Sequence, residues 1–488
     1  MTNQEAHTHN SKSTHNLHPT KHPRKVANRL SSSFKNRTNE LFLIRQTIND
    51  LQNGHTVQYP LINIHGVPGI GKSALLEKVA HEFNNQDVTG FYCNLEDLPR
   101  EDLYETKLSF LKELAEGMAK FTHNFDVTVL SPPLNYDSDE EKREQAINIA
   151  IDQLAQYFIR QNQIILLIVD SWEYVQETLF AWFELRLLFP LISQARVFGL
   201  FGSQAQLRWR QFEVRRRVSP YLLQPLDTIA TAEQVHVNET IAQQIYHLTF
   251  GHPSANETVR REIGDAGGNT AIIAVNQPAI LETIVEEIIQ RANKILQRNK
   301  DTSPYAFVEI TTELRSILSV AALLRDFDVN TLRVMLQRIF PTFANRSQSA
   351  LMLSIRQLAE TRLIRWVEAS RSYQIDPTLR HIFAREVEIN HPDWYTTIRE
   401  AAAEFYRKLA DDIPSRSDEY LIEYLYQSLC HLDWSNESRQ KLLTEFASYL
   451  RRYPSTQVRA ILEQDTEIQA ALLQHELSIE VLLEGMPA

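Results

Sequence analysis

The residues of this chain best suited to chemistry lie in one glycine-rich segment, residues 66–73, which reads Gly-Val-Pro-Gly-Ile-Gly-Lys-Ser. The segment matches the pattern G-x-x-x-x-G-K-[ST], whose glycines let the backbone wrap a phosphate and turn its N–H groups inward. Lys72 would reach the β- and γ-phosphates of a nucleotide, and the Ser73 hydroxyl would bind Mg²⁺. The motif therefore predicts a site for ATP or ADP with Mg²⁺. The residues expected around the phosphates are Gly66, Val67, Pro68, Gly69, Ile70, Gly71, Lys72, Ser73 and Ala74.

Besides the glycine-rich loop, a nucleotide site of this kind needs an acidic residue to hold the metal. The run Ile164–Asp170 supplies it. A buried strand that ends in Asp170 places a carboxylate at the carboxyl edge of a parallel sheet, where ligands bind. Asp170 is therefore the expected Mg²⁺ ligand. Glu173 follows three residues later and is the candidate general base, acting with Lys72 in catalysis. The alternative is that Glu173 only complements the dipole of a following helix.

Apolar runs that alternate with helical patterns predict the scaffold for these groups. Strands are expected at Leu61–His65, Val88–Asn94, Ile164–Val169 and Ala195–Phe201. Each strand is apolar along most of its length, which is typical of a parallel sheet covered by helices on both faces. The fold class is accordingly α/β, with the glycine-rich loop between a strand and a helix.

The remainder of the chain is predicted to be largely helical. An amphipathic helix is expected from about Pro278 to Leu296, and residues 305–390 show helices followed by a hairpin of Arg362–Val367 and Ser372–Ile375. Three helices and a two-stranded wing are typical of a winged helix. The predicted divisions are a His-rich tail at 1–33, a nucleotide-binding domain at 34–232, a helical domain at 233–304, a winged-helix domain at 305–390 and a helical region at 391–488.

Composition excludes several classes of protein. The 488 residues contain 13 Gly, 50 Lys and Arg, and 61 Asp and Glu, so the net charge is −11. Few glycines argue against an all-β fold, and the acidic balance argues against a general nucleic-acid coat protein. The two cysteines, Cys93 and Cys430, suggest neither a zinc site nor a disulfide framework, and a cytoplasmic location is expected. No membrane span and no secretory signal are expected. His7 and His9 are read as part of a solvated tail, with metal binding as the alternative.

Three further motifs resemble those of STAND NTPases, the signal-transduction relatives of AAA+ ATPases. Residues 34–41, from Phe34 to Leu41, resemble the pattern F-x-G-R-x-x-E-L. Val169–Glu173 resembles the Walker B motif of the bacterial members, and Gly251–Pro253 resembles a G-x-P motif. The resemblance covers about residues 34–390, and the shared order of the motifs supports it.

The resemblance implies a bistable switch, in which ADP holds the nucleotide domain against the winged helix and ATP opens the molecule for assembly. It also implies that Arg37 lines the adenine side and that Pro253 packs against the base or ribose. The C-terminal helices are expected to contact a partner protein or a second copy of the chain.

Two positions depart from the family pattern. Gln204 stands where an arginine commonly senses the γ-phosphate, and Arg208 or Arg210 are possible substitutes. Asp376 stands where a histidine commonly contacts the β-phosphate of ADP, and its carboxylate would repel that phosphate. Alternatively, Asp376 caps the helix that begins at Pro377.

The functional hypothesis is an ATP-binding, slowly hydrolysing regulatory switch. One alternative is an ATP-gated winged-helix DNA-binding regulator or loader, whose recognition helix would span about Gln348–Leu358. Another is a nucleotide-binding scaffold without hydrolysis. The arginines between Arg208 and Arg217 are interpreted as a solvated helix face, with a phosphate-contacting or nucleic-acid-contacting role as the alternative.

Overall fold

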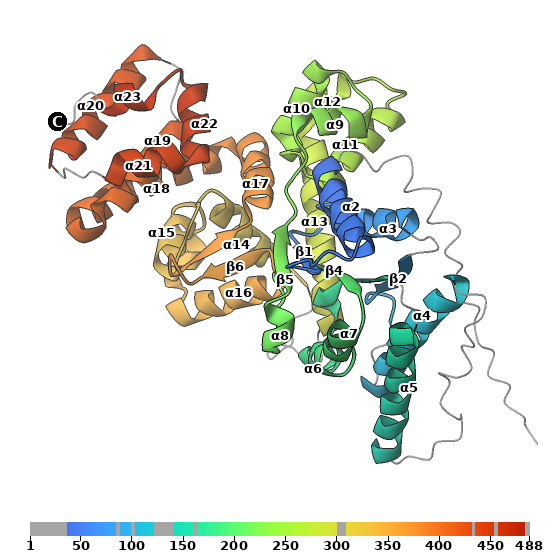
Figure 1. Cartoon of the computed structure of the whole chain (residues 1–488). Helices are drawn as coiled ribbons and strands as arrows, with labels where there is room; N and C mark the ends of the chain where they lie inside the picture. The colour runs from blue at the N-terminus through green and yellow to red at the C-terminus, as the bar shows by residue number, and fades with distance from the viewer. Residues whose placement is uncertain are drawn as a thin grey trace, which may run out of the picture.

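The computed structural model describes residues 37–83, 88–98, 103–121, 140–160, 164–299, 309–431, 435–452 and 457–483. The predicted tail 1–33 and Phe34 lie outside the described residues. Figure 1 shows a parallel sheet with its helices at the lower right, a helical group above it, the winged helix to its left, and the C-terminal helices at the upper left. No helix among the described residues is long and apolar enough to cross a membrane.

Within the described residues, five strands form one parallel sheet in the order β2-β3-β4-β1-β5. The strands are β1 (Leu61–His65), β2 (Val88–Asn94), β3 (Ile164–Asp170), β4 (Val197–Ser203) and β5 (Val218–Leu222). The sequence predicted the first four, although β4 lies two residues later than expected. It missed β5, which contains Pro220. This strand lies at the edge of the sheet, where a proline does not interrupt a ladder of hydrogen bonds on both sides.

The sheet is buried on both faces, as its apolar strands predicted. Ile164, Leu166 and Ile168 of β3 belong to one hydrophobic cluster, and the alternate residues of the strand belong to a second. The first cluster continues into the later helical parts of the chain, and the second contains several Phe and Trp side chains that pack on the other face of the sheet.

The sheet domain also contains helices and short turns. These are α2 (Thr38–Gln52), α3 (Lys72–Glu82), α4 (Leu103–Phe121), α5 (Glu140–Arg160), η2 (Trp172–Tyr174), α6 (Glu177–Trp182), η3 (Phe183–Leu188), α7 (Phe189–Gln194) and α8 (Phe212–Arg215).

A group of helices follows the sheet and lies above it in Figure 1. Its members are α9 (Thr228–Val235), α10 (Glu239–Thr249), α11 (Pro253–Asp265), α12 (Ile272–Val275) and the long α13 (Gln277–Asn299). Side chains of Asp227, Asn238 and His252 accept hydrogen bonds from the first turns of α9, α10 and α11, which fixes where these helices begin. The helix α13 contacts α11, α12, α17 (Pro377–Asn390) and η2, so it joins the sheet domain to the next part of the chain.

The predicted arrangement of three helices and a wing is present. It consists of α14 (Thr312–Ala322), α15 (Val329–Ile339), η4 (Pro341–Asn345), α16 (Gln348–Glu360), β6 (Ile364–Val367) and β7 (Ser372–Ile375). The strands β6 and β7 pair antiparallel. β6 begins two residues later than predicted because Arg362 has a left-handed backbone conformation, with φ = 60°, and cannot belong to a strand.

The C-terminal region is helical, as predicted. It contains α18 (Pro392–Asp412), η5 (Pro414–Arg416), α19 (Ser417–His431), α20 (Asn436–Arg452), α21 (Gln457–Gln464), α22 (Thr466–Gln474) and α23 (Ile479–Leu483). The pair α18 and α19 packs closely, and α18 also contacts α15 and α17 of the winged-helix part. The predicted domain boundaries at 232, 304 and 390 stay predictions.

Candidate phosphate-binding site

Strand register brings the predicted site residues to one edge of the sheet. Val169 of β3 pairs with Phe201 of β4, and Phe201 pairs with Asn63 of β1. The carboxyl ends of these parallel strands are therefore level. The glycine-rich loop, the acidic segment after β3 and the segment after β4 consequently meet at this edge.

The glycine-rich loop surrounds the buried amine of Lys72, the first residue of α3. Its Nζ donates to the carbonyl oxygens of Gly66 at 2.8 Å and Val67 at 3.0 Å. Burial lowers the pKa of Lys72, whereas Glu173 and Asp170 raise it. Gly69 has φ = 82°, and a Cβ there would lie 2.7 Å from His252 Cε1 and collide with Arg291. Only glycine permits this close approach of later helices to the loop.

The carboxylate of Asp170 lies between the loop and β4. Its Oδ1 accepts the backbone N–H of Ser171 at 2.8 Å, and the Ser73 side chain also hydrogen-bonds to it. A Cβ at Gly202 would overlap Asp170 Oδ1, so glycine at this position leaves room for the carboxylate. Burial raises the pKa of Asp170, and the hydrogen bond from Ser73 lowers it.

The donor set at Ser73 and Asp170 fits Mg²⁺. Both residues offer hard oxygen atoms, which this ion prefers. The second oxygen of Asp170, Oδ2, is buried and has no hydrogen-bond partner in the described part of the chain. A buried carboxylate oxygen without a partner is costly unless a cation or water satisfies it.

Glu173 is carried back toward the loop by a strained turn. Ser171 is buried and has φ = 66°, a conformation that costs a non-glycine residue roughly 1–2 kcal/mol. This turn starts η2, from which Glu173 projects into a cavity also lined by Gly66, Val67 and Gln204. Burial raises the pKa of Glu173, whereas Lys72 lowers it. The Oε2 of Glu173 and the Oε1 of Gln204 are both buried without a partner among the described residues.

Arg37 holds the back of the loop. Its Nη2 donates to the carbonyl oxygen of Ile70 at 2.8 Å, and its Nη1 donates to that of Gln224 at 2.7 Å. The guanidinium also pairs with Glu40 at 3.4 Å. Arg37 is buried, so it ties the glycine-rich loop to the segment after β5. Whether it also lines the adenine side stays a prediction.

The G-x-P segment contacts the loop directly. The backbone N–H of Ser254 donates to the carbonyl oxygen of Gly69 at 3.2 Å. Pro253 lies so near Gly71 that a Cβ atom added to this glycine would be 3.9 Å from Pro253 Cγ. His252 Nδ1 accepts from Ala255 N, which assigns the proton to Nε2, and Nε2 donates to the carbonyl oxygen of Pro68 at 2.9 Å. Burial lowers the pKa of His252 to about 4, so the ring is neutral at pH 7.

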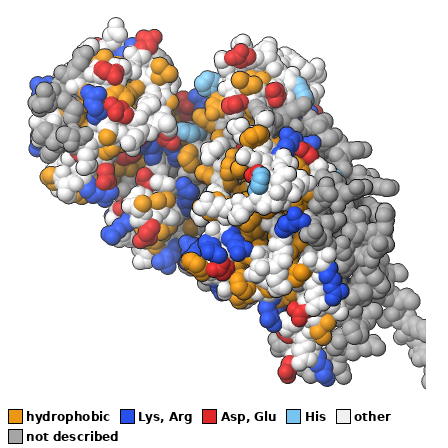
Figure 2. Space-filling model, viewed as in Figure 1, with side chains coloured by type: hydrophobic (Ala, Val, Ile, Leu, Met, Phe, Trp, Pro, Cys, Tyr) orange, Lys and Arg blue, Asp and Glu red, His pale blue; other side chains and the backbone are white. Residues whose placement is uncertain are grey.

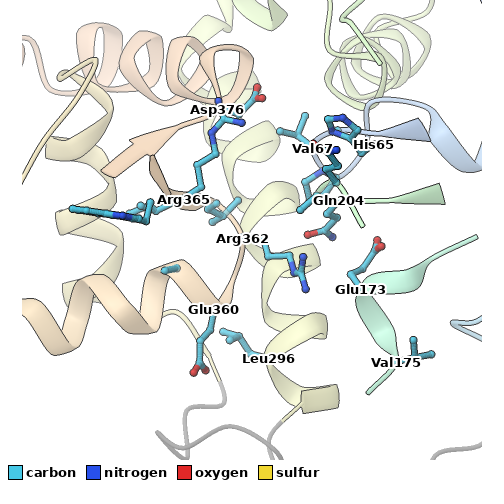
Figure 3. A pocket seen from close by; sticks show the side chains of 18 of the residues that line it. His65, Val67, Glu173, Val175, Gln204, Leu296, Glu360, Arg362, Arg365 and Asp376 are labelled. Atoms are coloured by element: carbon cyan, nitrogen blue, oxygen red, sulfur yellow. The ribbon is translucent and has the colours of Figure 1, made fainter. Parts of the chain in front are cut away.

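Asp376 caps a helix, as one of the two alternatives for it predicted, and its position beside a β-phosphate stays a prediction. Its side chain accepts the backbone N–H of Thr378 at 3.0 Å and so caps α17, and it also lines the same cavity as Glu173. Burial raises the pKa of Asp376, and the hydrogen bond from Thr378 and the charge of Arg365 lower it. Figure 3 shows Arg365 extending toward Asp376.

Several residues near the site were not identified from the sequence. These are His252, Arg291, Arg362, Arg365 and Asn63. Asn63 is buried on β1, and its side chain bonds Phe201 O, Ser203 Oγ and Leu207 N, which fixes the loop that carries Gln204. A polar residue inside an apolar strand was a signal that could have identified Asn63. Arg291, Arg362 and Arg365 resemble ordinary surface cations in the sequence.

The suggested substitutes for a γ-phosphate-sensing arginine lie elsewhere. Arg208 and Arg210 do not line the cavity, and Arg210 pairs with Glu177. His381 lies five residues after Asp376, the position where the family pattern has a histidine. It stacks on Phe250, with ring centroids 4.7 Å apart, and does not line the cavity either.

The arginines between Arg208 and Arg217 were expected to lie on one helix face. The helix in this segment, α8, has only four residues, so it carries only part of the cluster. Arg215 and Arg216 are exposed, whereas Arg217 donates to the carbonyl oxygen of Ile192 at 2.6 Å. Figure 2 shows Lys and Arg side chains gathered near the middle of this face, where α8 lies in Figure 1.

Comparison with known proteins gives only remote similarity. No family model and no curated protein matches the chain. Among solved structures, the chain is similar to the ORC2 protein of Aeropyrum pernix in ADPNP–ADP complexes, with 11% identity, coverage of 78% of this chain and 98% of that one, and a TM-score of 0.40. It is similar to the ORC1 protein of Aeropyrum pernix in complex with DNA, with 12% identity, 74% and 96% coverage, and a TM-score of 0.38. The RuvB Holliday junction branch migration motor of Thermotoga maritima gives 12% identity, 71% and 94% coverage, and a TM-score of 0.34. At this level of similarity, residue roles must come from the geometry of this chain.

Proposed function

We propose that this chain is a STAND-type regulatory switch that binds ATP or ADP with Mg²⁺ and hydrolyses ATP slowly. The observation that supports this most directly is the convergence of Lys72, Asp170 and Glu173 at the carboxyl edge of one parallel sheet. The helical group packs directly on the same glycine-rich loop, through His252 and Ser254. A phosphate bound in the loop would therefore affect the position of the helical group that contacts the loop.

Each residue has a distinct role in this proposal. Backbone N–H groups of the loop and the N-terminus of α3 bind the phosphates, and Lys72 adds a point charge. Ser73 and Asp170 would hold Mg²⁺, which supplies charge neutralisation at the phosphates. Glu173 would accept a proton from the attacking water, and its raised pKa makes it a better base than an exposed carboxylate. Gln204 would hydrogen-bond the transferred phosphoryl group.

The alternative of an ATP-gated DNA-binding protein has less support. The helix α16 would be the recognition helix, and Arg356 is its single cationic residue. The last residues of α16, Ala359 and Glu360, line the cavity beside the glycine-rich loop. This end of the helix is therefore directed at the nucleotide domain. Salt-dependent binding of duplex DNA by the ATP-loaded chain would favour the alternative.

Nucleotide binding is tested by substituting Lys72. Calorimetric titration of Lys72→Ala with ATP and Mg²⁺ is expected to give no measurable binding, because the charge at the phosphates is removed. Lys78→Ala is the matched control, since Lys78 is exposed on the same helix. Unchanged ATP affinity in Lys72→Ala would exclude the proposed site.

Hydrolysis is tested separately at Glu173. The isosteric Glu173→Gln variant is expected to bind ATP with wild-type affinity and to lose turnover, because an amide cannot accept the proton of water. Glu177→Gln, at an exposed position four residues later, is the control. Wild-type turnover in Glu173→Gln would exclude Glu173 as the base. A wild-type chain that binds ATP without any turnover would favour the non-hydrolysing scaffold.

A further inference from the structure

A cavity of about 850 Å³ separates the glycine-rich loop from the winged helix. One wall is formed by residues 65–68 of the loop, by Glu173 of η2 and by Gln204 after β4. The opposite wall is formed by the end of α16, by β6 and by Asp376 at the start of α17. The space adjoining Glu173 and Gln204 is the side of the loop where a third phosphate would extend, because these two residues are the ones proposed to contact it.

Arg362 enters this cavity from the winged-helix side. Figure 3 shows its side chain directed at Glu173. Arg362 is exposed, and its guanidinium makes no hydrogen bond or ion pair with any residue that the structure describes. Burial raises the pKa of Glu173, and the positive charge of Arg362 is among the groups that oppose this rise, so the two side chains lie within electrostatic range of each other.

The backbone at Arg362 is in the left-handed conformation that usually selects glycine or asparagine. It follows Thr361, the C-cap of α16, and its N–H donates to the carbonyl oxygen of Ala359 at 3.0 Å. Thr361 is fully buried, and its hydroxyl bonds both Leu358 O and Leu363 N, so the turn is rigid. The turn therefore aims a long cationic side chain at the cavity at a cost that glycine would avoid.

The second arginine of this wall has a different environment. Arg365 lies beside Asp376, the residue at the position implied to contact the β-phosphate of ADP. The charges of Arg365 and Asp376 offset each other, so this part of the wall offers little net charge to a diphosphate. The guanidinium of this wall that is directed at Glu173 is that of Arg362.

We propose that Arg362 is the residue by which this chain distinguishes a nucleoside triphosphate from a diphosphate, and that the triphosphate holds the winged helix against the nucleotide domain. The inference rests on the proposed function, because it requires a nucleotide at Lys72. The proposal differs from what the family resemblance implies, because there ADP favours the closed molecule and here ATP does. A ligand shifts a conformational equilibrium only by its differential affinity for the two states, and the γ-phosphate is the group that gains a contact with Arg362 in the closed state.

The test compares two arginines that share a backbone conformation. Arg362→Asn removes the charge and keeps a residue that tolerates φ > 0. Arg371→Asn is the matched control, because Arg371 has φ = 52° in the hairpin turn of the same winged helix and does not line the cavity. Affinities for ADP and for the slowly hydrolysed analogue ATPγS are measured by calorimetry for the full chain and both variants. The distance between spin labels on exposed Lys78 of α3 and exposed Arg356 of α16, each replaced by cysteine, is measured with each nucleotide.

The wild type and Arg371→Asn are expected to prefer ATPγS and to show the shorter label distance with it. Arg362→Asn is expected to lose about tenfold in ATPγS affinity, which is the loss expected for one charge-assisted hydrogen bond, with ADP affinity unchanged. Its label distance should become the same with both nucleotides.

Two results would overturn the proposal while leaving the proposed function intact. The first is an unchanged ratio of ATPγS to ADP affinity in Arg362→Asn. The second is a shorter label distance with ADP than with ATPγS in the wild type. A wild-type chain that binds neither nucleotide, or a Lys72→Ala variant that binds both normally, would instead overturn the proposed function and this inference with it.

Discussion

The winged-helix part has two boundaries that use arginine in opposite ways. At the boundary with the glycine-rich loop, Arg362 and Arg365 extend into a cavity and form no ion pair among the described residues. At the boundary with the C-terminal helices, which we call the C-terminal seam, Arg325 pairs with Glu423 and Asp465, and Arg380 pairs with Glu467. The same residue type is available to a ligand on one side and committed to the fold on the other.

Burial explains the difference at the C-terminal seam. Arg380 is 2% exposed, and Arg399, also 2% exposed, donates to Leu323 O at 2.6 Å and Gln427 Oε1 at 2.8 Å. Burial alone would lower the pKa of Arg325, but Glu423 and Asp465 raise it above its usual value. Removing one partner from such a buried pair leaves an uncompensated charge, which is strongly destabilising. The C-terminal seam therefore joins α14–α17 and α18–α22 firmly.

The loop boundary has the opposite composition. Its cations, Arg362 and Arg365, face a cavity. The neighbouring contact of the helical group with the same loop is made by a neutral histidine, His252, which donates to the carbonyl oxygen of Pro68. A boundary of this kind can change when a charged ligand arrives. The comparison therefore predicts that substitutions at the C-terminal seam change stability, whereas substitutions at the loop boundary change nucleotide response.

The largest effect on stability is expected for Arg380→Ala. The substitution removes the partner of Glu467 and leaves space where a buried guanidinium was, so the free energy of unfolding should fall by about 3–5 kcal/mol. Thermal denaturation of the full chain measures it. ATP affinity of the folded variant should match that of the wild type. A loss below about 1 kcal/mol would show that the seam is not held by this pair.

Lowering the pH is expected to weaken the contact of His252 with the glycine-rich loop. The folded-state pKa of His252 is about 4 and its unfolded value is near 6.5, so the unfolded chain binds more protons as pH falls between these values. The stability that His252 contributes is complete above about pH 6.5 and declines by up to about 2 kcal/mol at pH 5. Glu467 at the C-terminal seam behaves differently, because His381 and Arg380 hold its pKa far below the usual value despite burial. Its contribution to stability is complete above its unfolded pKa of about 4.5 and declines progressively below it.

The measurement compares melting temperatures of the wild type and His252→Gln between pH 7.5 and 5. Gln keeps a donor for Pro68 O and does not titrate, so the difference between the two curves isolates His252 from the buried carboxylates, whose raised pKa values act in the opposite direction. Parallel curves for the two proteins would contradict the assignment of a neutral, titrating His252.

A smaller effect is expected at Asp376, which belongs to both the fold and the cavity. Asp376→Ala removes the cap of α17 and should cost about 1 kcal/mol, whereas Asp376→Asn should keep the cap and cost only a few tenths. Because Asn also leaves Arg365 without a compensating charge, this variant should bind ADP more tightly than the wild type. Equal melting temperatures for the Ala and Asn variants would exclude the capping role.

The smallest effect on stability is expected for Arg362→Asn. Arg362 is exposed and has no protein partner among the described residues, and Asn is better suited to its backbone conformation. The free energy of unfolding, obtained from thermal denaturation, should differ from that of the wild type by less than about 0.5 kcal/mol. A loss comparable with that of Arg380→Ala would erase the distinction between the two boundaries.

The sequence was sufficient to predict much of the fold, and the candidate site residues Lys72, Asp170 and Glu173 that it indicated lie at one edge of the sheet. The apolar runs around Ile62, Ile168 and Leu200 predicted strands buried on both faces, and the two hydrophobic clusters confirm this. The strand-and-helix context of residues 66–73 is present as expected. The sequence was less informative where one residue overrides a pattern, as with Pro220 in the edge strand β5 and left-handed Arg362 before β6.

The features that could be predicted from the amino-acid sequence are local ones. Glycines at fixed spacing, an aspartate at the end of an apolar run and a helical period of apolar residues each follow from backbone geometry over a few positions. Which arginines are paired and which face the cavity depends on contacts between elements that are distant in the chain. Arg362 and Arg380 are both cations near helix ends, and nothing within several residues of either one distinguishes them. Glu173, which Arg362 faces across the cavity, and Glu467, which pairs with Arg380, lie 189 and 87 positions away in the chain. It is therefore the packing of distant elements that commits one charge to the fold and leaves the other available to a phosphate.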